Sequence, residues 1–268
     1  MRCLDRRGRK LQVSLGRSEF LGKKVFIAGG GRGIGRAVAI SLAEAGADVA
    51  VSYLRNDRTA RLVARQVEGC GHRAILVKGN LRDVAVIDEA KEILSRSFKT
   101  VDIFVYCIAM GICRPIRDLS SLQLDRTFEI NARTFIVCVN KLRSIMPRGA
   151  VIVALSSLGA QRYIKDYASI GMAKAYLEAA IRYLGAELAP GIRVNGVSSG
   201  PVLTEGLRVY PGFQEGLKLT KELTPARRLG TPEDVAEIVR FLCSDASQWI
   251  YGQTIIADGG LSLRVVPL

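Results

Sequence analysis

The sequence is poor in the residues that build metal sites and histidine-based relays, since His72 is its only histidine. Because that histidine follows Gly69 and Gly71 in an expected surface loop, a His-based metal site and a Ser/His/Asp triad are both excluded. The six cysteines are scattered without a C-x-x-C pair, which indicates reduced thiols in a cytoplasmic compartment and predicts no metal centre.

Long apolar runs are also missing. The longest nearly apolar stretch, from Ile103 to Met110, is far shorter than the roughly 20 residues that cross a bilayer. The N-terminal segment is rich in arginine and has no apolar core, so it is not a secretory signal. We therefore expect a cytoplasmic protein with no membrane partner. The alternative for this segment is the remnant of an organellar targeting peptide, against which Asp5 and Glu19 argue.

Acidic residues are outnumbered, with 25 Asp and Glu against 39 Lys and Arg and a net charge of +14. Residues 1–20 hold six of the positive charges, and we interpret them as a basic extension before a single domain at 21–268. Such a surplus attracts nucleic acid, anionic lipid, a polyanionic cofactor or an acidic protein. The basic residues late in the chain lack the regularly interleaved aromatic residues on which bases stack, so we expect no nucleic-acid partner.

Seven short runs rich in Val and Ile alternate with amphipathic, helix-period segments. The runs are Val25–Ala28, Val49–Tyr53, Ala74–Val77, Ile103–Cys107, Val151–Leu155, Val194–Val197 and Thr254–Ala257. They are apolar at successive residues, as strands buried on both faces are. The alternation predicts an α/β fold, namely a single Rossmann-type doubly wound domain. Its seven-stranded sheet is expected to be mostly parallel, with helices on both faces.

A glycine-rich loop separates the first run from a helical segment. It reads Gly29-Gly30-Gly31-Arg32-Gly33-Ile34-Gly35, and the strand-before, helix-after context is the one that a dinucleotide site requires. Glycines let the backbone approach a pyrophosphate, whose charge is met by N–H groups at the helix N-terminus. We expect this loop to bind a cofactor; the alternative is a plain turn.

The choice of cofactor depends on the residues after the second run. NAD enzymes usually place an acid there to hold the ribose hydroxyl, but no acid occurs between Ser52 and Asn56. Arg55 stands there instead, and Arg32 lies in the glycine loop. Two guanidinium groups can bind a 2′-phosphate, so we predict NADPH. The alternative is that both arginines are solvated surface charges.

A tyrosine and a lysine at helical spacing are the catalytic candidates. Lys174 follows Tyr167 by seven residues, about two helical turns, so both should share one face. An ammonium beside a phenol would lower the pKa of that phenol and suit it to proton donation or oxyanion stabilisation.

These residues together carry a family resemblance. Gly29–Gly35, Asn131, Ser157, Tyr167 and Lys174 resemble the short-chain dehydrogenase/reductase superfamily over nearly the whole chain from residue 23. Most members place the lysine four residues after the tyrosine, where this chain has Gly171. The Tyr-x6-Lys spacing is instead similar to that of enoyl-acyl-carrier-protein reductases, and the glycine-arginine loop resembles the NADPH-dependent type III branch.

The resemblance implies NADPH-dependent reduction of trans-2-enoyl thioesters, carried on acyl carrier protein or coenzyme A, in fatty-acid biosynthesis. Tyr167 would stabilise the thioester oxygen, Lys174 would hold the nicotinamide ribose, and Asn131 would organise a water chain. Ser157 is the fourth catalytic candidate. The further cofactor contacts implied are Asn80, Leu81, Ile108, Ala109, Gly200, Pro201, Val202 and Thr204, and the substrate contacts are Met110, Tyr163, Leu203 and Leu207.

Several alternatives stay open at this stage. Ser157 matches the serine of carbonyl-reducing relatives, which leaves reduction of a ketone or 3-oxoacyl group as the second enzymatic hypothesis. A dinucleotide-binding regulator without turnover is the third. Packing is the favoured role of Tyr163, and core filling is an alternative for Met110, Leu203, Leu207 and Phe213.

Two expectations concern partners. Relatives pair the long helices that correspond to Leu122–Met146 and Tyr167–Leu188, so the resemblance implies a homotetramer. An acidic carrier protein could be steered by the basic residues around the expected substrate cover, and the alternative is an ordinary solvated face. These residues are Arg208, Lys218, Lys221, Arg227 and Arg228.

Overall fold

The computed structural model describes residues 19–205 and 213–263. Seven strands alternate with helices along this part of the chain: β1 (Lys24–Ala28), β2 (Asp48–Tyr53), β3 (Ala74–Lys78), β4 (Ile103–Tyr106), β5 (Ala150–Ser157), β6 (Ile192–Ser199) and β7 (Thr254–Ala257). They form one sheet in the order β3-β2-β1-β4-β5-β6-β7. The predicted fold class is confirmed. The sheet is wholly parallel, where a mostly parallel one was expected.

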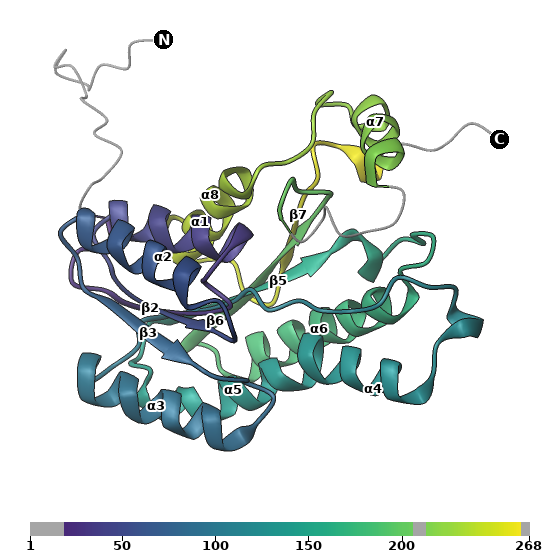
Figure 1. The fold of residues 1–268 in the computed structure, drawn as a ribbon. Helices are drawn as coiled ribbons and strands as arrows, with labels where there is room; N and C mark the ends of the chain where they lie inside the picture. The colour runs from purple at the N-terminus through teal and green to yellow at the C-terminus, as the bar shows by residue number, and fades with distance from the viewer. Residues whose placement is uncertain (1–18, 206–212, 264–268) are drawn as a thin grey trace, which may run out of the picture.

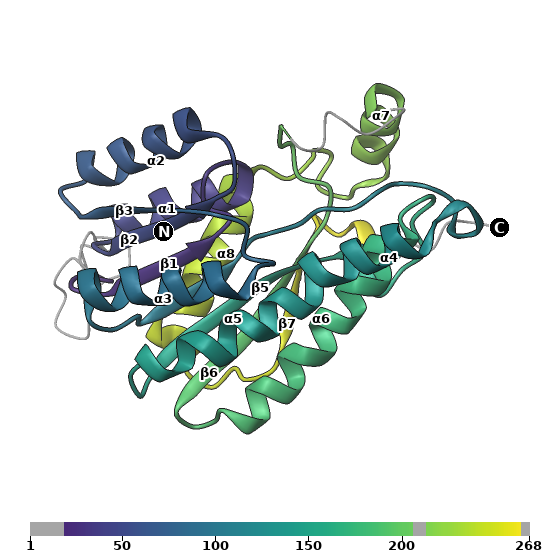
Figure 2. The same cartoon turned by 60° about the horizontal axis from the view of Figure 1, so that its bottom comes forward.

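Helices cover both faces of the sheet (Figures 1 and 2). One layer holds α1 (Gly33–Glu44), α2 (Asp57–Gly69) and α8 (Pro232–Cys243), and the other holds α3 (Val84–Phe98), α4 (Ser121–Phe128), α5 (Thr134–Leu142) and α6 (Ala168–Glu187). Each layer encloses its own apolar core. Along β1, Val25 and Ile27 lie in one core while Phe26 and Ala28 lie in the other. This arrangement explains why the strands are apolar at successive residues.

The strand order fixes where a ligand can bind. β1 lies between β2 and β4, so the chain crosses from one side of β1 to the other after β3. In such sheets the crevice at the carboxyl ends of the strands, at this point of reversal, is the usual ligand site. The helix α7 (Phe213–Leu223) stands apart from both helical layers (Figure 1).

Local sequence signals account for the helix ends. Thr231 caps α8 by accepting from Asp234 N at 3.2 Å, while Asp234 Oδ2 accepts from Thr231 N at 2.7 Å, and Pro232 opens the helix. Gly46 follows α1 with φ of +107°, a conformation that favours glycine. Among the described residues, no helix combines the length and apolar character that a bilayer crossing needs.

Candidate functional site

The glycine loop after β1 is built for close backbone approach. A Cβ on Gly35 would lie 2.3 Å from the carbonyl oxygen of Gly29, so no side chain fits there. Gly29 has φ of +83°, and its N–H is held by Ser52 Oγ at 3.0 Å. The following helix α1 has neither a side-chain cap nor an acid in its first turn. Its positive end is therefore left for an anionic ligand, and the loop fits a pyrophosphate.

The two arginines predicted to select the cofactor are both exposed. Arg32 immediately precedes α1, and Arg55 lies between β2 and α2. Within the described residues neither forms an ion pair or a hydrogen bond through its side chain. The nearby Asp57 is already engaged, since Tyr53 Oη donates to it at 2.8 Å and Lys78 Nζ at 3.0 Å. The arginines thus keep their charges for a ligand phosphate.

The predicted cofactor contacts after β3 and β4 differ in accessibility. Asn80 is partly exposed, whereas the side chain of Leu81 is buried in the core and is not open to a ligand. Ile108 lies against the glycine loop, because a Cβ on Gly29 would meet its Cγ1 at 3.1 Å. Ala109 beside it is exposed. Only the backbone of Leu81 can therefore make the predicted contact with the cofactor.

Tyr167 and Ser157 come together at the end of β5. Tyr167 is the residue before α6, and its phenol is hydrogen-bonded by the Ser157 side chain. Burial raises the pKa of Tyr167 above its usual value, and the bond to Ser157 offsets only part of that rise. The expectation that Lys174 lowers the pKa of Tyr167 is therefore wrong, because burial is the dominant effect.

Lys174 lies in the second turn of α6 and is 2% exposed. Its Nζ donates to the carbonyl oxygen of Leu155 at 2.7 Å, so lysine and tyrosine both face β5, as their spacing predicts. Burial lowers the pKa of Lys174 from its usual 10.5 to about 8, and interactions with Cys107 and Glu178 act in the opposite direction.

Packing explains why the lysine is not four residues after the tyrosine. That position, Gly171, lies against the turn after β5, and a Cβ there would be 2.6 Å from the carbonyl oxygen of Gly159. Gly159 in turn makes room for the tyrosine, because its own Cβ would lie 2.5 Å from Tyr167 Cδ1. No side chain fits at Gly171, and the next position of α6 that faces β5 is Lys174.

Asn131 lies where the long helix predicted at Leu122–Met146 is interrupted. A π-helical turn, Glu129–Arg133, joins α4 to α5 and buries Asn131 completely. Its Nδ2 donates to the carbonyl oxygens of Met110 and, at 2.8 Å, Thr127. Its Oδ1 is buried and has no hydrogen-bond partner among the described residues. Such an acceptor requires a water or ligand donor, which fits the predicted role in a water chain.

The predicted substrate and nicotinamide residues border this site. Thr204 faces the glycine loop, since a Cβ on Gly33 would lie 3.5 Å from its Cγ2. The preceding segment of predicted contacts, Gly200–Leu203, is tied to Gly230 by a β-bridge at Val202 and by Leu203 N donating to Gly230 O at 2.9 Å. Val202 itself is buried, so its side chain belongs to the core.

The apolar residues expected to contact substrate are open. Met110 is 50% exposed, Leu203 is 44% exposed and Tyr163 is 90% exposed. The prediction of core filling is therefore wrong for Met110 and Leu203, and the prediction of packing is wrong for Tyr163. Leu207 lies outside the described residues, and of Phe213 the structure describes only that it begins α7.

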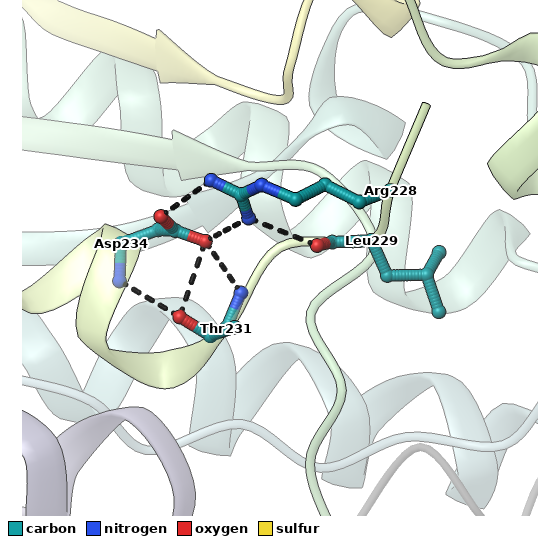
Figure 3. Close-up of polar contacts among 4 residues, drawn as sticks. All are labelled: Arg228, Leu229, Thr231 and Asp234. Atoms are coloured by element: carbon teal, nitrogen blue, oxygen red, sulfur yellow. Dashed lines mark hydrogen bonds and ion pairs between the residues drawn. The ribbon is translucent and has the colours of Figure 1, made fainter. Parts of the chain in front are cut away.

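The basic residues near α7 are not equivalent, and Arg228 is paired with an acid, Asp234 (Figure 3). Both terminal nitrogens of Arg228 donate hydrogen bonds to the carboxylate of Asp234, Nη2 to Oδ1 at 2.8 Å. These hydrogen bonds hold the pKa of the Asp234 carboxyl well below its usual range. The charge of Arg228 is thus largely neutralised within the chain. Lys218, Lys221 and Arg227 are exposed, and Arg208 lies outside the described residues.

A cavity of about 520 Å³ opens beside this ion pair, among residues of the β6 and β7 ends and the start of α8. It shares Gly200 and Pro201 with the predicted cofactor contacts. None of the four catalytic candidates lines it.

With this geometry established, the comparisons with known proteins identify the family. A family model described as enoyl-(acyl carrier protein) reductase matches residues 28–262. The chain belongs to this family of short-chain dehydrogenases/reductases. As a short-chain oxidoreductase it belongs to a group that uses nicotinamide cofactors.

Individual relatives span more than one activity. The chain is 34% identical over 246 residues to 1-cyclohexenylcarbonyl-CoA reductase of Streptomyces collinus, covering 90% of this chain and 88% of that one. It is 33% identical over 250 residues to L-rhamnose 1-dehydrogenase (NAD(P)(+)) of Sphingomonas sp., covering 91% and 98%. Among solved structures, the Bacillus cereus enoyl-acyl carrier protein reductase with NADP⁺ and indole naphthyridinone has a TM-score of 0.87 at 28% identity, covering 93% and 100%.

Several residues of this oxidoreductase escaped the sequence analysis. Gly159 is one, because its role depends on contacts with Tyr167 and Gly171 that no spacing shows. Glu178 is another: it is 4% exposed, one turn beyond Lys174. In the sequence, the signal that could have found Glu178 was an acid four residues after the candidate lysine. Cys107 also interacts with Lys174, and burial raises the pKa of its thiol to about 12.

Proposed function

We propose that this protein is an NADPH-dependent reductase of trans-2-enoyl thioesters. The observation that carries the proposal is the placement of Tyr167 and Lys174, seven residues apart, against β5, with Gly171 closed to any side chain. Relatives named as reductases of a CoA ester and of enoyl-acyl carrier protein support it. Fatty-acid biosynthesis in the cytoplasm is the setting that we infer.

The residues that would hold the dinucleotide come from four strand ends. The glycine loop and the N-terminus of α1 would bind the pyrophosphate, and Arg32 and Arg55 the 2′-phosphate. Asn80 would border the adenine, and the segment Gly200–Thr204 the nicotinamide. When bound, NADPH supplies the hydride that reduces the β-carbon of the enoyl group.

Tyr167 would act on the oxygen of the thioester carbonyl, where negative charge develops. Because the pKa of its phenol is raised, the group stays protonated at neutral pH and can donate a hydrogen bond. In a low-dielectric site such a donor is worth a few kcal/mol. Ser157 fixes the direction of the phenol through its hydrogen bond.

Lys174 and Asn131 would support this donor. Lys174 would bind the ribose hydroxyls of the nicotinamide half, held in place by its bond to Leu155. The unpartnered Oδ1 of Asn131 would accept from a water that returns protons toward the lysine.

The acyl group is proposed to enter past the exposed Met110, Leu203 and Tyr163, carried on acyl carrier protein or coenzyme A. Lys218, Lys221 and Arg227 would attract an acidic carrier, an effect on association rate more than on affinity. The assembly we propose is a homotetramer.

The deciding experiment follows oxidation of NADPH with crotonyl and longer enoyl thioesters, with 3-oxoacyl thioesters in parallel, for the wild-type protein and Tyr167→Phe. We expect enoyl-dependent oxidation that falls about 10²–10³-fold in the variant, the cost of removing one oxyanion donor. NADPH titration by fluorescence is the control, because the variant should bind the cofactor normally.

A ketone or 3-oxoacyl reductase is the second candidate, favoured by the hydrogen bond between Ser157 and Tyr167. A relative named L-rhamnose 1-dehydrogenase belongs to the same family. Turnover of the 3-oxoacyl substrate alone would establish this alternative. Cofactor binding without turnover of either thioester would favour a different substrate first and a dinucleotide-binding regulator second.

A further inference from the structure

Behind Lys174, a buried carboxylate is held by two neutral side chains. Glu178 lies on α6 and is 4% exposed. Its Oε1 accepts from Ser156 Oγ at 2.7 Å, and its Oε2 accepts from Gln161 Nε2 at 2.8 Å. Both oxygens therefore receive a donor, as an ionised carboxylate requires.

A buried anion is costly unless a positive charge compensates it. Glu178 follows Lys174 by four residues, so the two side chains emerge on the same face of α6. They form no direct ion pair. Their interaction is electrostatic and acts through the protein interior. Lys174 is hydrogen-bonded to Leu155 O, and Glu178 is hydrogen-bonded to Ser156, the next residue of β5.

The other groups around Lys174 are neutral near pH 7. The thiol of Cys107, beyond β4, has its pKa raised to about 12 by burial, and the pKa of Tyr167 is raised as well. Asn131 is uncharged. Among the described residues, Glu178 is therefore the one anion that acts on Lys174.

We propose that Glu178 is a positioning residue that keeps Lys174 protonated, and that Ser156 and Gln161 hold its carboxylate for this task. The proposal rests on the proposed function in one respect, which is that Lys174 serves the site as a cation. Gln161 belongs to the segment that leads from Ser157 to Tyr167, so the same carboxylate also ties that segment to α6.

The test measures the free energy of unfolding by urea from pH 6 to 10, without cofactor or substrate. Lys174 has a lower pKa in the folded than in the unfolded chain, so between about 8 and 10.5 the unfolded chain binds more protons. The contribution of Lys174 to the free energy of unfolding therefore rises with pH across that window. Lys174→Met should abolish this rise, which would show that the rise comes from Lys174.

Glu178→Gln keeps the shape of the side chain and removes its charge. We expect the rise to begin about one pH unit lower in Glu178→Gln, and to vanish in Glu178→Gln/Lys174→Met. Loss of stability with an unchanged starting pH would mean that Glu178 is only structural, which would overturn the proposal.

Ser156→Ala guards against a Glu178 variant that fails to fold. It retains the carboxylate and its charge, so the rise should begin at the same pH as in the wild-type protein, and a shift to lower pH would count against a role for the charge. Because this assay uses no substrate, its result is independent of enoyl turnover. The pH profile of kcat/KM for the enoyl thioester should then show the same shift on its alkaline limb.

Discussion

Two exposed guanidinium groups are the residues that we propose select the nicotinamide cofactor. Arg32 and Arg55 flank the predicted adenosine site from different loops, and Asp57, the acid closest to Arg55 in sequence, is bonded to Tyr53 and Lys78. A carboxylate that is already engaged competes poorly for ribose hydroxyls. The proposed preference for a 2′-phosphate would therefore depend on the arginines.

We predict that Arg55→Ala weakens NADPH binding about 10–100-fold, the worth of one or two charge-assisted hydrogen bonds. Binding of NADH, which lacks the phosphate, should change little. Fluorescence titration of both cofactors measures the effect. Arg65→Ala, an exposed site further along α2, is the control for net charge. Equal weakening for both cofactors would contradict a phosphate-specific role.

At the scale of elements, α6 packs closely against the turn after β5. Gly171 contacts the backbone of Gly159, and Gly159 contacts the ring of Tyr167. The position of the phenol is therefore set by two glycines in contact, which makes this junction sensitive to a single methyl group.

We predict that Gly171→Ala destabilises the fold by about 1–3 kcal/mol, the usual cost of overpacking. Helix propensity alone predicts the opposite, a gain of about 1 kcal/mol, so the sign of the change is decisive. Urea denaturation measures it. Gly69→Ala, at the end of α2 with nothing within 4 Å of the added Cβ, should be neutral or slightly stabilising.

At the scale of the whole molecule, apolar side chains remain exposed along α4 and α6. Met172, Tyr176 and Tyr183 recur along α6 at exposures of 49%, 45% and 71%. Phe128 of α4 packs edge-to-face on Tyr176 at 4.7 Å between ring centroids, so the patch is continuous across both helices. Such a surface is typical of an interface between subunits.

We predict that Met172→Glu/Tyr183→Glu dissociates the proposed homotetramer into smaller species, because two buried charges would face their symmetry mates. Light scattering after size-exclusion chromatography gives the mass. Leu62→Glu changes a side chain that is 45% exposed on α2, in the opposite helical layer, and should leave the mass unchanged. A wild-type monomer would contradict the tetramer itself.

The sequence by itself determined the α/β architecture, the seven strands, the glycine loop and the seven-residue spacing of Tyr167 and Lys174. These features depend on short-range patterns, namely apolar periodicity, glycine spacing and helix caps, which fix local backbone geometry. The resemblance to short-chain oxidoreductases rests on the same local motifs.

Only the tertiary structure decided how these residues interact. It showed that burial raises the pKa of Tyr167, that Gly171 is closed by Gly159, and that Glu178 lies behind Lys174. It also showed that the side chains of Leu81 and Val202, two predicted cofactor contacts, are buried in the core. Desolvation and steric contact depend on segments distant in sequence, so no local pattern contains them.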